Sequence, residues 1–534
     1  MQRAIVSGLL TLFFNMTVWA QEQPNFLIIV TDDMGYTDLG AFGSMDIPTP
    51  NLDRLARSGI RLTNFHAAPS CAPTRAMLMS GTGNHEAGLG TQLFNALFEG
   101  EYGYERFLQT RVATMPEVLQ AGGYHTMMSG KWHIGEGDPS GSTLPSNHGF
   151  DRDYTLLRGA DSHYDSIPGA TYSDDGNVME LGDNPEYSTI RYTDKLLGFL
   201  ADHQASNEPF FAVYAPTAPH WPLQYPPGWE DRFTGAYDDG FDALCEQRMT
   251  GARRENVLPA NASIQTCNKE TGPWSELSPE NRERYTRLME IYAAMSAHLD
   301  ESIGQILAYM DANGMLENTW VIYMNDNGPQ GGDITARMVR GVSEDYFDNS
   351  YANLGSATSW ASVGQGWADA TNSPFRNTKA TQFEGGIRVA AFAWHKDIAS
   401  PGRIDNQFLT VMDIMPTVLD LAGLDTPTGT FDGREILSIR GKSMVPMLTG
   451  DRVHSADEAI ALDSAGNHMM VKGDWKIVKP PRRDWLLFNI SDDPRESRDL
   501  ATSMPEQLAT LVAEFNRFAI ERNYIEVNAE INQP

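Results

Sequence analysis

The chain contains very little cysteine: 3 residues in a length of 534. A small scaffold held together by many disulfides is therefore excluded, and buried apolar side chains must supply the stability. This length is sufficient for one large core and a smaller lobe. The odd number also implies that, in an exported protein, one thiol stays unpaired. The three residues are Cys71, Cys245 and Cys267.

Positive charge is also scarce, with 40 Lys and Arg against 70 Asp and Glu and a formal net charge of −30. Such a surface repels polyanions, which argues against a nucleic-acid partner and against binding to anionic membranes. Any site for an anion must therefore be built locally, from a few cationic side chains, against the field of the whole molecule.

Beyond the N-terminus the chain has no apolar run that approaches the ~18 residues of a membrane-spanning helix. Residues 1–20 combine Arg3, an apolar stretch from Ile5 to Met16 and a cleavage-like Val18-Trp19-Ala20. This arrangement is typical of a secretory signal, with a retained anchor as the alternative. We expect a soluble mature protein exported to the periplasm or secreted.

Cys245 and Cys267 lie in a polar segment rich in Arg, Asn and Glu. We predict that they form a disulfide that closes a surface loop, stabilising the fold by ~3 kcal/mol at most. Two free buried thiols are the alternative. The predicted pairing leaves Cys71 as the unpaired thiol.

Strand-like and helix-like patterns alternate over residues 25–430, which predicts a mixed, mostly parallel sheet with helices on both faces. The segment from Tyr225 to about Pro279 is expected to be an irregular surface excursion. After about residue 435 the pattern changes to short strands and a final helix. The expected organisation is a signal peptide (1–20), a catalytic domain (21–434) and a C-terminal α+β subdomain (435–534) with a short antiparallel sheet. Expected strands cover 25–30, 60–65, 124–129, 209–215, 319–324, 474–478 and 484–489, and expected helices cover 49–58, 114–121, 187–200, 284–313 and 505–523.

Cys71 stands at the predicted start of a helix that Gly81 ends. Pro73 suits the first turn, because its missing N–H costs nothing there. The helix dipole and Arg75, one turn further on, would make the surroundings of residue 71 electropositive. On this stretch alone, an ordinary buried cysteine at a helix start is an equally good interpretation.

Unusual polar residues follow the predicted strands at the ends where parallel sheets bind ligands. Four of them offer only oxygen ligands, which suits Ca²⁺, with Mg²⁺ as the alternative, and argues against Zn²⁺. The others offer donors and positive charge, so the set predicts a cation beside a site for an oxyanion such as sulfate or phosphate. The oxygen set is Asp32, Asp33, Asp326 and Asn327, and the donor set is Arg75, Lys131, His133, His220 and Lys379.

At these motifs the chain resembles the type I sulfatases of the alkaline phosphatase superfamily, and most closely the bacterial arylsulfatases. Thr74 departs from the family pattern, where Ser is commoner, and Met79-Ser80-Gly81 replaces the usual Leu-Thr-Gly. The resemblance covers nearly the whole mature chain, and the motifs that carry it are residues 25–40, Cys71-Ala72-Pro73-Thr74-Arg75, Gly130-Lys131-Trp132-His133-Ile134-Gly135, Ala218-Pro219-His220-Trp221-Pro222, Asn325-Asp326-Asn327-Gly328 and Glu384-Gly385-Gly386-Ile387-Arg388-Val389.

The resemblance implies an alkaline phosphatase-like fold and oxidation of Cys71 to formylglycine by a formylglycine-generating enzyme. The aldehyde hydrate of residue 71 would attack sulfur and later release sulfate. The roles implied for the other residues are metal binding by Asp32, Asp33, Asp326 and Asn327 with the residue 71 oxygen, stabilisation of the hydrate by Arg75 and Lys131, base catalysis by His133, and binding of the sulfate and leaving oxygen by His220 and Lys379.

The function expected from this resemblance is hydrolysis of a sulfate monoester by an arylsulfatase-type enzyme. The alternatives are a sulfatase acting on a sulfated glycan, a phosphonate or phosphodiester hydrolase on the same fold, and a non-catalytic protein that binds sulfated glycans. Side chains expected to line the pocket or stack on the substrate are His85, His163, Trp132, Trp221, Tyr164, Trp360 and Trp367.

Overall fold

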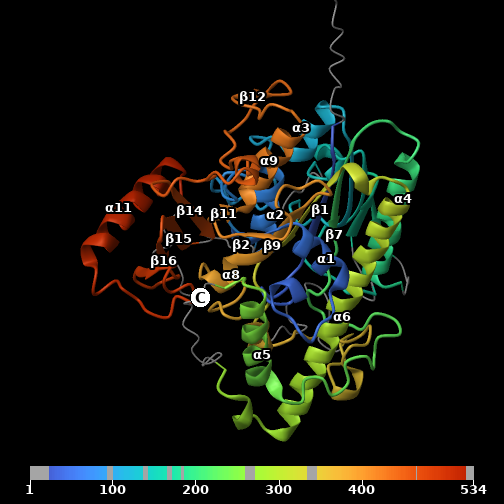
Figure 1. The fold of residues 1–534 in the computed structure, drawn as a ribbon, viewed down its shortest axis with the longest axis vertical. Helices are drawn as coiled ribbons and strands as arrows, with labels where there is room; N and C mark the ends of the chain where they lie inside the picture. Colours follow the sequence, from blue (N-terminus) through green and yellow to red (C-terminus); the bar gives the residue numbers. More distant parts are fainter. Residues whose placement is uncertain are drawn as a thin grey trace, which may run out of the picture.

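The computed structural model describes residues 23–92, 100–135, 142–164, 171–181, 186–258, 271–332, 346–464 and 466–524. Its centre is a sheet of 11 strands in the order β10-β2-β9-β8-β1-β7-β3-β4-β5-β6, with β11 paired to β2 (Figure 1). The strands are β1 (Asn25–Thr31), β2 (Ile60–His66), β3 (His125–Lys131), β4 (Arg152–Leu156), β5 (Thr171–Asp174), β6 (Asn177–Glu180), β7 (Phe210–Ala215), β8 (Thr319–Asn325), β9 (Arg388–Trp394), β10 (Arg403–Asp405) and β11 (Leu409–Thr410).

The middle of this sheet is parallel: β1 pairs in parallel with β7 and with β8, and β3 pairs in parallel with β7 and with β4. Strand β9 runs antiparallel to both of its neighbours, and β5 runs antiparallel to β4 and β6. The expected mixed, mostly parallel sheet is confirmed.

Strand β1 shows why both faces of the sheet are covered. Its alternate residues Leu27 and Ile29 belong to one apolar core, and Phe26, Ile28 and Val30 belong to another. Successive side chains of a strand point to opposite faces, so a continuous apolar run requires helices on both sides. The helices are α1 (Pro50–Ser58), α4 (Ser188–His203), α5 (Gly240–Arg254), α6 (Pro279–Ala312) and α7 (Gln365–Thr371) against the first core, and α2 (Cys71–Ser80), α3 (Met115–Ala121), α9 (Ile414–Leu421) and α10 (Val445–Leu448) against the second.

A second, smaller sheet follows in the chain and is antiparallel, as expected. Its strands, in the order β14-β15-β16-β17, pack against α11 through a separate apolar cluster that includes Ile477, Leu487 and Phe515. Figure 1 shows these elements in red at one side of the large sheet. Their bounds are β14 (Ala459–Ser464), β15 (Asn467–Lys472), β16 (Trp475–Lys479), β17 (Leu486–Asn489) and α11 (Pro505–Glu521), and a further pair, β12 (Thr430–Phe431) and β13 (Arg434–Glu435), precedes them.

The direction of the strands brings distant residues to one edge of the large sheet. The parallel strands β1, β3, β7 and β8 all end there, and the loop that joins β2 to α2 leaves from the same edge. Because β9 is antiparallel, it begins where its neighbours end, so the segment just before the short helix α8 (Glu384–Ile387) also lies at this edge.

The expectation that residues 225–279 form an irregular excursion is wrong for α5. Its buried residues Phe241, Leu244, Cys245, Arg248 and Met249 follow the spacing of a helical face, but an arginine in the middle of the stripe obscures the apolar pattern. Arg248 is completely buried and lies 2.9 Å from Asp38 Oδ1 and 2.7 Å from Asp46 Oδ1. It thereby anchors the loop that follows β1.

Cys245 is buried on α5 rather than exposed on a surface loop, and its sulfur lies 3.0 Å from Ser373 Oγ. Cys267 and the signal peptide (1–20) lie outside the described residues, so the disulfide and the signal both stay predictions. Among the helices described, none combines the length and the apolar character needed to cross a membrane.

The buried position of Arg248 generates a prediction for stability. Replacing it in Arg248→Leu leaves the buried carboxylate of Asp38 and the half-buried carboxylate of Asp46 without their cation, and removing one partner of such a buried pair typically costs about 3–5 kcal/mol. We expect a lower urea midpoint at an unchanged slope. Arg253→Leu, at an exposed position on the same helix, is the matched control and should unfold like the wild type. Equal midpoints for the two variants would contradict this account.

Candidate active site

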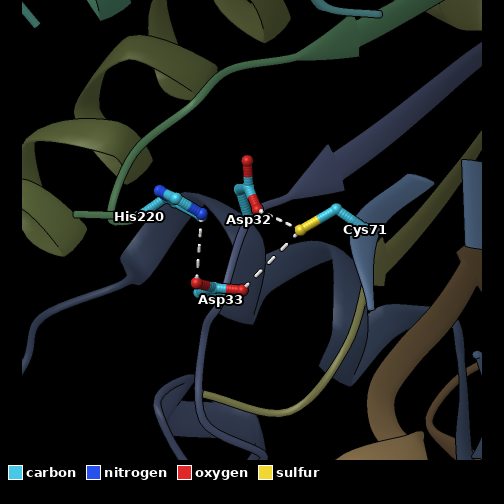
Figure 2. Close-up of side chains that lie close together, drawn as sticks. All are labelled: Asp32, Asp33, Cys71 and His220. Carbon is cyan, nitrogen blue, oxygen red and sulfur yellow. Dashed lines mark hydrogen bonds and ion pairs between the residues drawn. The ribbon is translucent and has the colours of Figure 1, made fainter. Parts of the chain in front are cut away.

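Four buried side chains converge at the carboxyl edge of the sheet (Figure 2). Asp32, Asp33, Cys71 and His220 each bring one ligand-type atom to within 4.8 Å of the others. The two aspartates follow β1, Cys71 is the first residue of α2, and His220 lies in the loop after β7. The topology thus brings together four of the predicted site residues that are far apart in the sequence.

The backbone beyond β1 is bent so that the two neighbouring aspartates face different partners. Asp33 adopts a left-handed conformation with φ of 61°, which is uncommon for a residue other than glycine. Its N–H donates to Asp326 Oδ1 at 3.3 Å, and the N–H of Asp326 donates to the carbonyl of Thr31 at 3.0 Å. The ends of the adjacent strands β1 and β8 therefore hold each other.

Three cationic side chains compensate the three buried carboxylates. Lys131 Nζ lies 2.6 Å from Asp32 Oδ2. Arg75 contacts Asp326 Oδ2 at 3.0 Å and donates to the carbonyl of Lys131 at 2.6 Å. Lys379 Nζ lies 2.7 Å from Asp33 Oδ1. Lys131 ends β3, Arg75 lies on α2, and Lys379 lies in the segment before β9, so the charge balance of the site depends on the whole edge of the sheet.

The carboxylates nevertheless compete for this positive charge. Burial alone would raise the pKa of Asp32, but Lys131, His220 and Arg75 together hold it well below its usual range. Burial and the neighbouring Asp32 charge raise the pKa of Asp326. Asp326 is therefore the carboxylate whose charged form is least stabilised by its surroundings, and a cation bound beside it would favour that charged form.

The surroundings of Cys71 differ from the electropositive pocket expected from its local sequence. Its sulfur lies 3.4 Å from Asp32 Oδ1 and 4.0 Å from Asp33 Oδ1, and Lys379 Nζ approaches it at 3.1 Å. Burial raises the pKa of the thiol, and the charges of Asp32 and Asp326 raise it further. Arg75, expected to make the surroundings of Cys71 electropositive, is engaged with Asp326, so the unmodified thiol is a weak nucleophile here.

His220 is held as one neutral tautomer. Its Nδ1 lies 2.6 Å from the carbonyl oxygen of Trp221, and because a carbonyl only accepts, Nδ1 carries the proton. The other nitrogen, Nε2, then presents its lone pair to Lys379 Nζ at 3.3 Å and lies 3.4 Å from Asp33 Oδ2. Burial lowers the pKa of His220 to about 4, which keeps the ring neutral at pH 7.

His133 is also buried and neutral. Its ring packs so closely against Gly159 that a Cβ there would stand 2.3 Å from Nε2. Burial, followed by the charges of Lys131 and Arg75, lowers its pKa well below the usual value. A neutral imidazole beside cationic groups retains a lone pair, as a base requires.

The other histidines proposed for the pocket have structural surroundings. His163 Nε2 donates to the carbonyl of His220 at 3.0 Å, and its Nδ1 lies 2.8 Å from Ser188 Oγ, so it supports the His220 loop from behind. His85 packs among the rings of Tyr102, Tyr104 and Tyr524.

The aromatic side chains proposed for the pocket fall into two groups, one held within the protein interior and one near His220. Trp132 is buried and donates to the carbonyl of Thr143 at 2.7 Å, and Trp367 packs in the core against Tyr237, Phe241 and Trp274. Tyr164 donates to the carbonyl of Tyr225. Trp221 does adjoin the site, because its ring centroid lies 4.7 Å from that of His220, and the Trp360 ring packs against Trp221 with 5.8 Å between the centroids.

The donor set fits a hard cation. Asn327 donates through Nδ2 to Asp33 Oδ1 at 2.6 Å, and its buried Oδ1 accepts no hydrogen bond among the described residues. That oxygen joins the carboxylates of Asp32, Asp33 and Asp326 as the oxygen-rich ligand set that Ca²⁺ or Mg²⁺ prefers. The geometry also brings His220 Nε2 close to these atoms, which the sequence-based ligand set omitted. A single histidine carries no sequence signal that separates a metal ligand from an anion donor.

Comparison with known proteins gives consistent relatives. The sulfatase family model matches residues 24–424. An uncharacterized sulfatase of Schizosaccharomyces pombe is 38% identical over 521 residues, which cover 92% of this chain and 92% of that protein. An arylsulfatase of Klebsiella aerogenes is 34% identical over 440 residues, which cover 79% of this chain and 92% of that protein.

Solved structures share the fold at lower identity. The crystal structure of Ps i-CgsB superposes with a TM-score of 0.66 at 23% sequence identity, covering 93% of this chain and 93% of that one. The likeness extends over both the large sheet and the smaller C-terminal sheet, since nearly the whole of each chain is covered.

Proposed function

Because this chain belongs to the sulfatase family, we propose that it is an arylsulfatase that cleaves aryl sulfate monoesters to a phenol and sulfate. Membership confirms the resemblance carried by the Cys71 and Lys131 motifs, and hydrolysis of sulfate esters follows from it. The preference for an aryl group is the finer proposal, and the aromatic side chains beside His220 carry it.

These side chains form a continuous series that we call the aromatic wall: Trp221, Trp360, Phe347 and Tyr346. From His220 the ring centroids succeed one another at 4.7, 5.8, 4.8 and 5.2 Å. Tyr346, the last, is 38% exposed, so the wall connects the buried site with the surface. The indole N–H groups of Trp221 and Trp360 make no hydrogen bond among the described residues. Rings with unused donors suit an aryl leaving group that carries a polar substituent.

The groups that the family implies fit the residues present. Asp32, Asp33, Asp326 and Asn327 would hold Ca²⁺, with Mg²⁺ as the alternative, and the cation would neutralise charge on the sulfate. Formylglycine at position 71 would supply the attacking oxygen that the poorly acidic thiol does not supply.

The chain's own side chains bind the anion and handle protons. Lys131 and Arg75 keep positive charge beside Asp32 and Asp326, and Lys379, which reaches position 71, donates to the sulfate and to the leaving oxygen. His220 retains its lone pair at Nε2 next to Lys379, so the two form one donor–acceptor pair facing the reacting atoms. Neutral His133 is the base in the step that releases sulfate.

Maturation and location complete the proposal. A formylglycine-generating enzyme acts on Cys71 before folding, because the residue is buried afterwards. The N-terminal signal directs the chain to the periplasm or out of the cell.

The Klebsiella aerogenes relative, itself an arylsulfatase, supports the aryl preference. A sulfated glycan is the second candidate substrate, since the faces of sugars also stack on tryptophan.

The first prediction of the proposed function concerns position 71. In protein from its native host, the peptide that contains residue 71 should be about 18 Da lighter than the cysteine form, the difference between a thiol and the aldehyde. Peptide mass spectrometry measures this shift. Cys71→Ala should lose activity by at least a hundredfold, because no other group supplies the nucleophile. Only unmodified Cys71 in native protein, or full activity of Cys71→Ala, would exclude the mechanism.

The second prediction concerns the leaving group. Trp360→Leu should lower kcat/KM for aryl sulfates about tenfold, since an aromatic contact and its area contribute about 1–1.5 kcal/mol. Trp320→Leu is the matched control, because Trp320 stacks on His395 at the start of β8, away from the site. A panel of aryl sulfates, sulfated sugars and aryl phosphate diesters measures the preference. Faster turnover of sulfated sugars or of phosphate diesters than of aryl sulfates would reject the aryl assignment.

The third prediction concerns the cation. Removal of divalent ions with a chelator should lower the thermal unfolding midpoint, and added Ca²⁺ should restore it, because an ion bound only by the folded state contributes about 2.7 kcal/mol at a hundredfold excess over Kd. Asp326→Asn should reduce this shift. Asp300→Asn, a buried carboxylate that binds the first N–H groups of α1, should keep it. A wild-type midpoint that ignores both chelator and Ca²⁺ would refute the metal assignment.

A further inference from the structure

Lys379 reaches the site from a segment with no regular structure, residues 376–383, which we call the Lys379 segment. Two loops of the large sheet hold its backbone. The N–H of Lys379 donates to the carbonyl of Pro329 at 3.1 Å, and the N–H of Ala380 donates to the carbonyl of Pro69 at 2.7 Å. The segment is thus tied to the loop after Asn327 and to the loop before Cys71.

The Lys379 segment is not in a conformation that it would keep by itself. Asn377 has φ of 64° and Ala380 has φ of 69°, both in the left-handed region that non-glycine residues seldom occupy. Such conformations persist where surrounding contacts determine them. The position of the Lys379 ammonium therefore depends on the groups that bind this backbone from outside.

The smaller sheet provides one of these groups. Asn467, the first residue of β15, donates through Nδ2 to the carbonyl of Ala380 at 3.1 Å. Its own carbonyl accepts from Gln382 Nε2 at 3.0 Å. Asn467 is buried, with 6% of its surface exposed, and it lies beyond residue 424, where the match to the family model ends.

A second contact from the C-terminal part holds the ends of the same segment. The side chain of Glu496 accepts from the N–H of Glu384 at 2.6 Å, and its carbonyl accepts from Arg376 at 3.0 Å. Lys476 on β16 lies between the two carboxylates, 2.7 Å from Glu384 and 2.8 Å from Glu496. These buried charges fix the ends of the segment, and Asn467 fixes its middle, next to Lys379.

We propose that Asn467 is a positioning residue for Lys379, so that the smaller C-terminal sheet completes the active site as well as stabilising the fold. Asn467 acts by donating to the carbonyl of Ala380, which holds the left-handed turn that directs Lys379 toward Cys71 and Asp33. The inference rests on the proposed function in that Lys379 binds the sulfate and its leaving oxygen.

A double-mutant cycle with inorganic sulfate tests the proposal without requiring turnover. Asn467→Ala should weaken sulfate binding, measured by calorimetry, about tenfold. This is less than the roughly hundredfold that a misplacement of about 1 Å can cost in rate, because binding depends less sharply on position than the reaction does. Lys379→Ala should weaken it as much or more. In the Lys379→Ala background, Asn467→Ala should have no further effect, because the two act through one group. Additive losses, or an unchanged affinity in Asn467→Ala, would overturn the proposal.

A series of aryl sulfates then separates positioning from stability. Misplacing Lys379 should cost more for phenyl sulfate than for 4-nitrophenyl sulfate, because the poorer leaving group needs more help. His468→Ala is the matched control: it removes the 2.7 Å contact with Asp463 in the same hairpin, so it should lower the unfolding midpoint without changing the ratio of the two rates. Asn467→Asp keeps the size of the side chain and removes the donor, and should behave like Asn467→Ala.

The outcomes distinguish a failure of the proposed arylsulfatase function from a failure of the positioning role of Asn467. If the wild type binds sulfate but hydrolyses none of the aryl sulfates, the proposed function fails while the sulfate cycle still judges the role of Asn467. If the wild type hydrolyses them and both Asn467 variants lose the same factor on every substrate, as a partly unfolded enzyme does, the positioning role is rejected.

Discussion

The burial of three carboxylates at the ends of two adjacent strands is the constraint on which this structure depends. Asp32, Asp33 and Asp326 lie 0–2% exposed, and an uncompensated buried charge costs several kcal/mol. The positive charges that compensate them come from three places: Lys131 at the end of β3, Arg75 on α2 and Lys379 before α8. A mostly parallel sheet that includes the antiparallel strand β9 meets this need, because it brings the ends of the parallel strands and the start of β9 to one edge.

The same charge distribution explains why a thiol is unsuitable as the working nucleophile at residue 71. Asp32 and Asp326 oppose a negative charge on sulfur, and burial opposes it further. An aldehyde hydrate needs no thiolate, and its oxygen ligates a hard cation more readily than a neutral thiol does. The conversion of Cys71 that we propose therefore turns an unfavourable electrostatic position into a useful one, and Lys379 at 3.1 Å then faces an oxygen instead of sulfur.

Much of the fold and of the site could be predicted where local sequence carries the signal. The continuous apolar run of β1 indicated a strand covered on both faces, and the polar residues after the strands indicated the liganding edge. Helix α5 was missed because Arg248 interrupts its apolar stripe, and its burial depends on Asp38 and Asp46, two hundred residues away in the sequence. The aromatic side chains were not separable either: Trp367 and Trp360 look alike in sequence, and only packing places one in the core against Phe241 and the other against Trp221, the neighbour of His220.

The contact between Asn467 and Ala380 shows why the position of the Lys379 side chain could not be predicted from the sequence. Its acceptor is a backbone carbonyl, which every residue has, so the residue type at position 380 does not indicate that Asn467 is its partner. Its donor belongs to a hairpin whose pattern predicts only a short antiparallel sheet. The charge of Lys379 places it in the donor set, and the family resemblance implies its role at the sulfate. The position of its ammonium, however, depends on a backbone turn that contacts from Pro69, Pro329 and Asn467 hold. Residue types identify the chemistry of this site, and long-range backbone contacts determine its geometry.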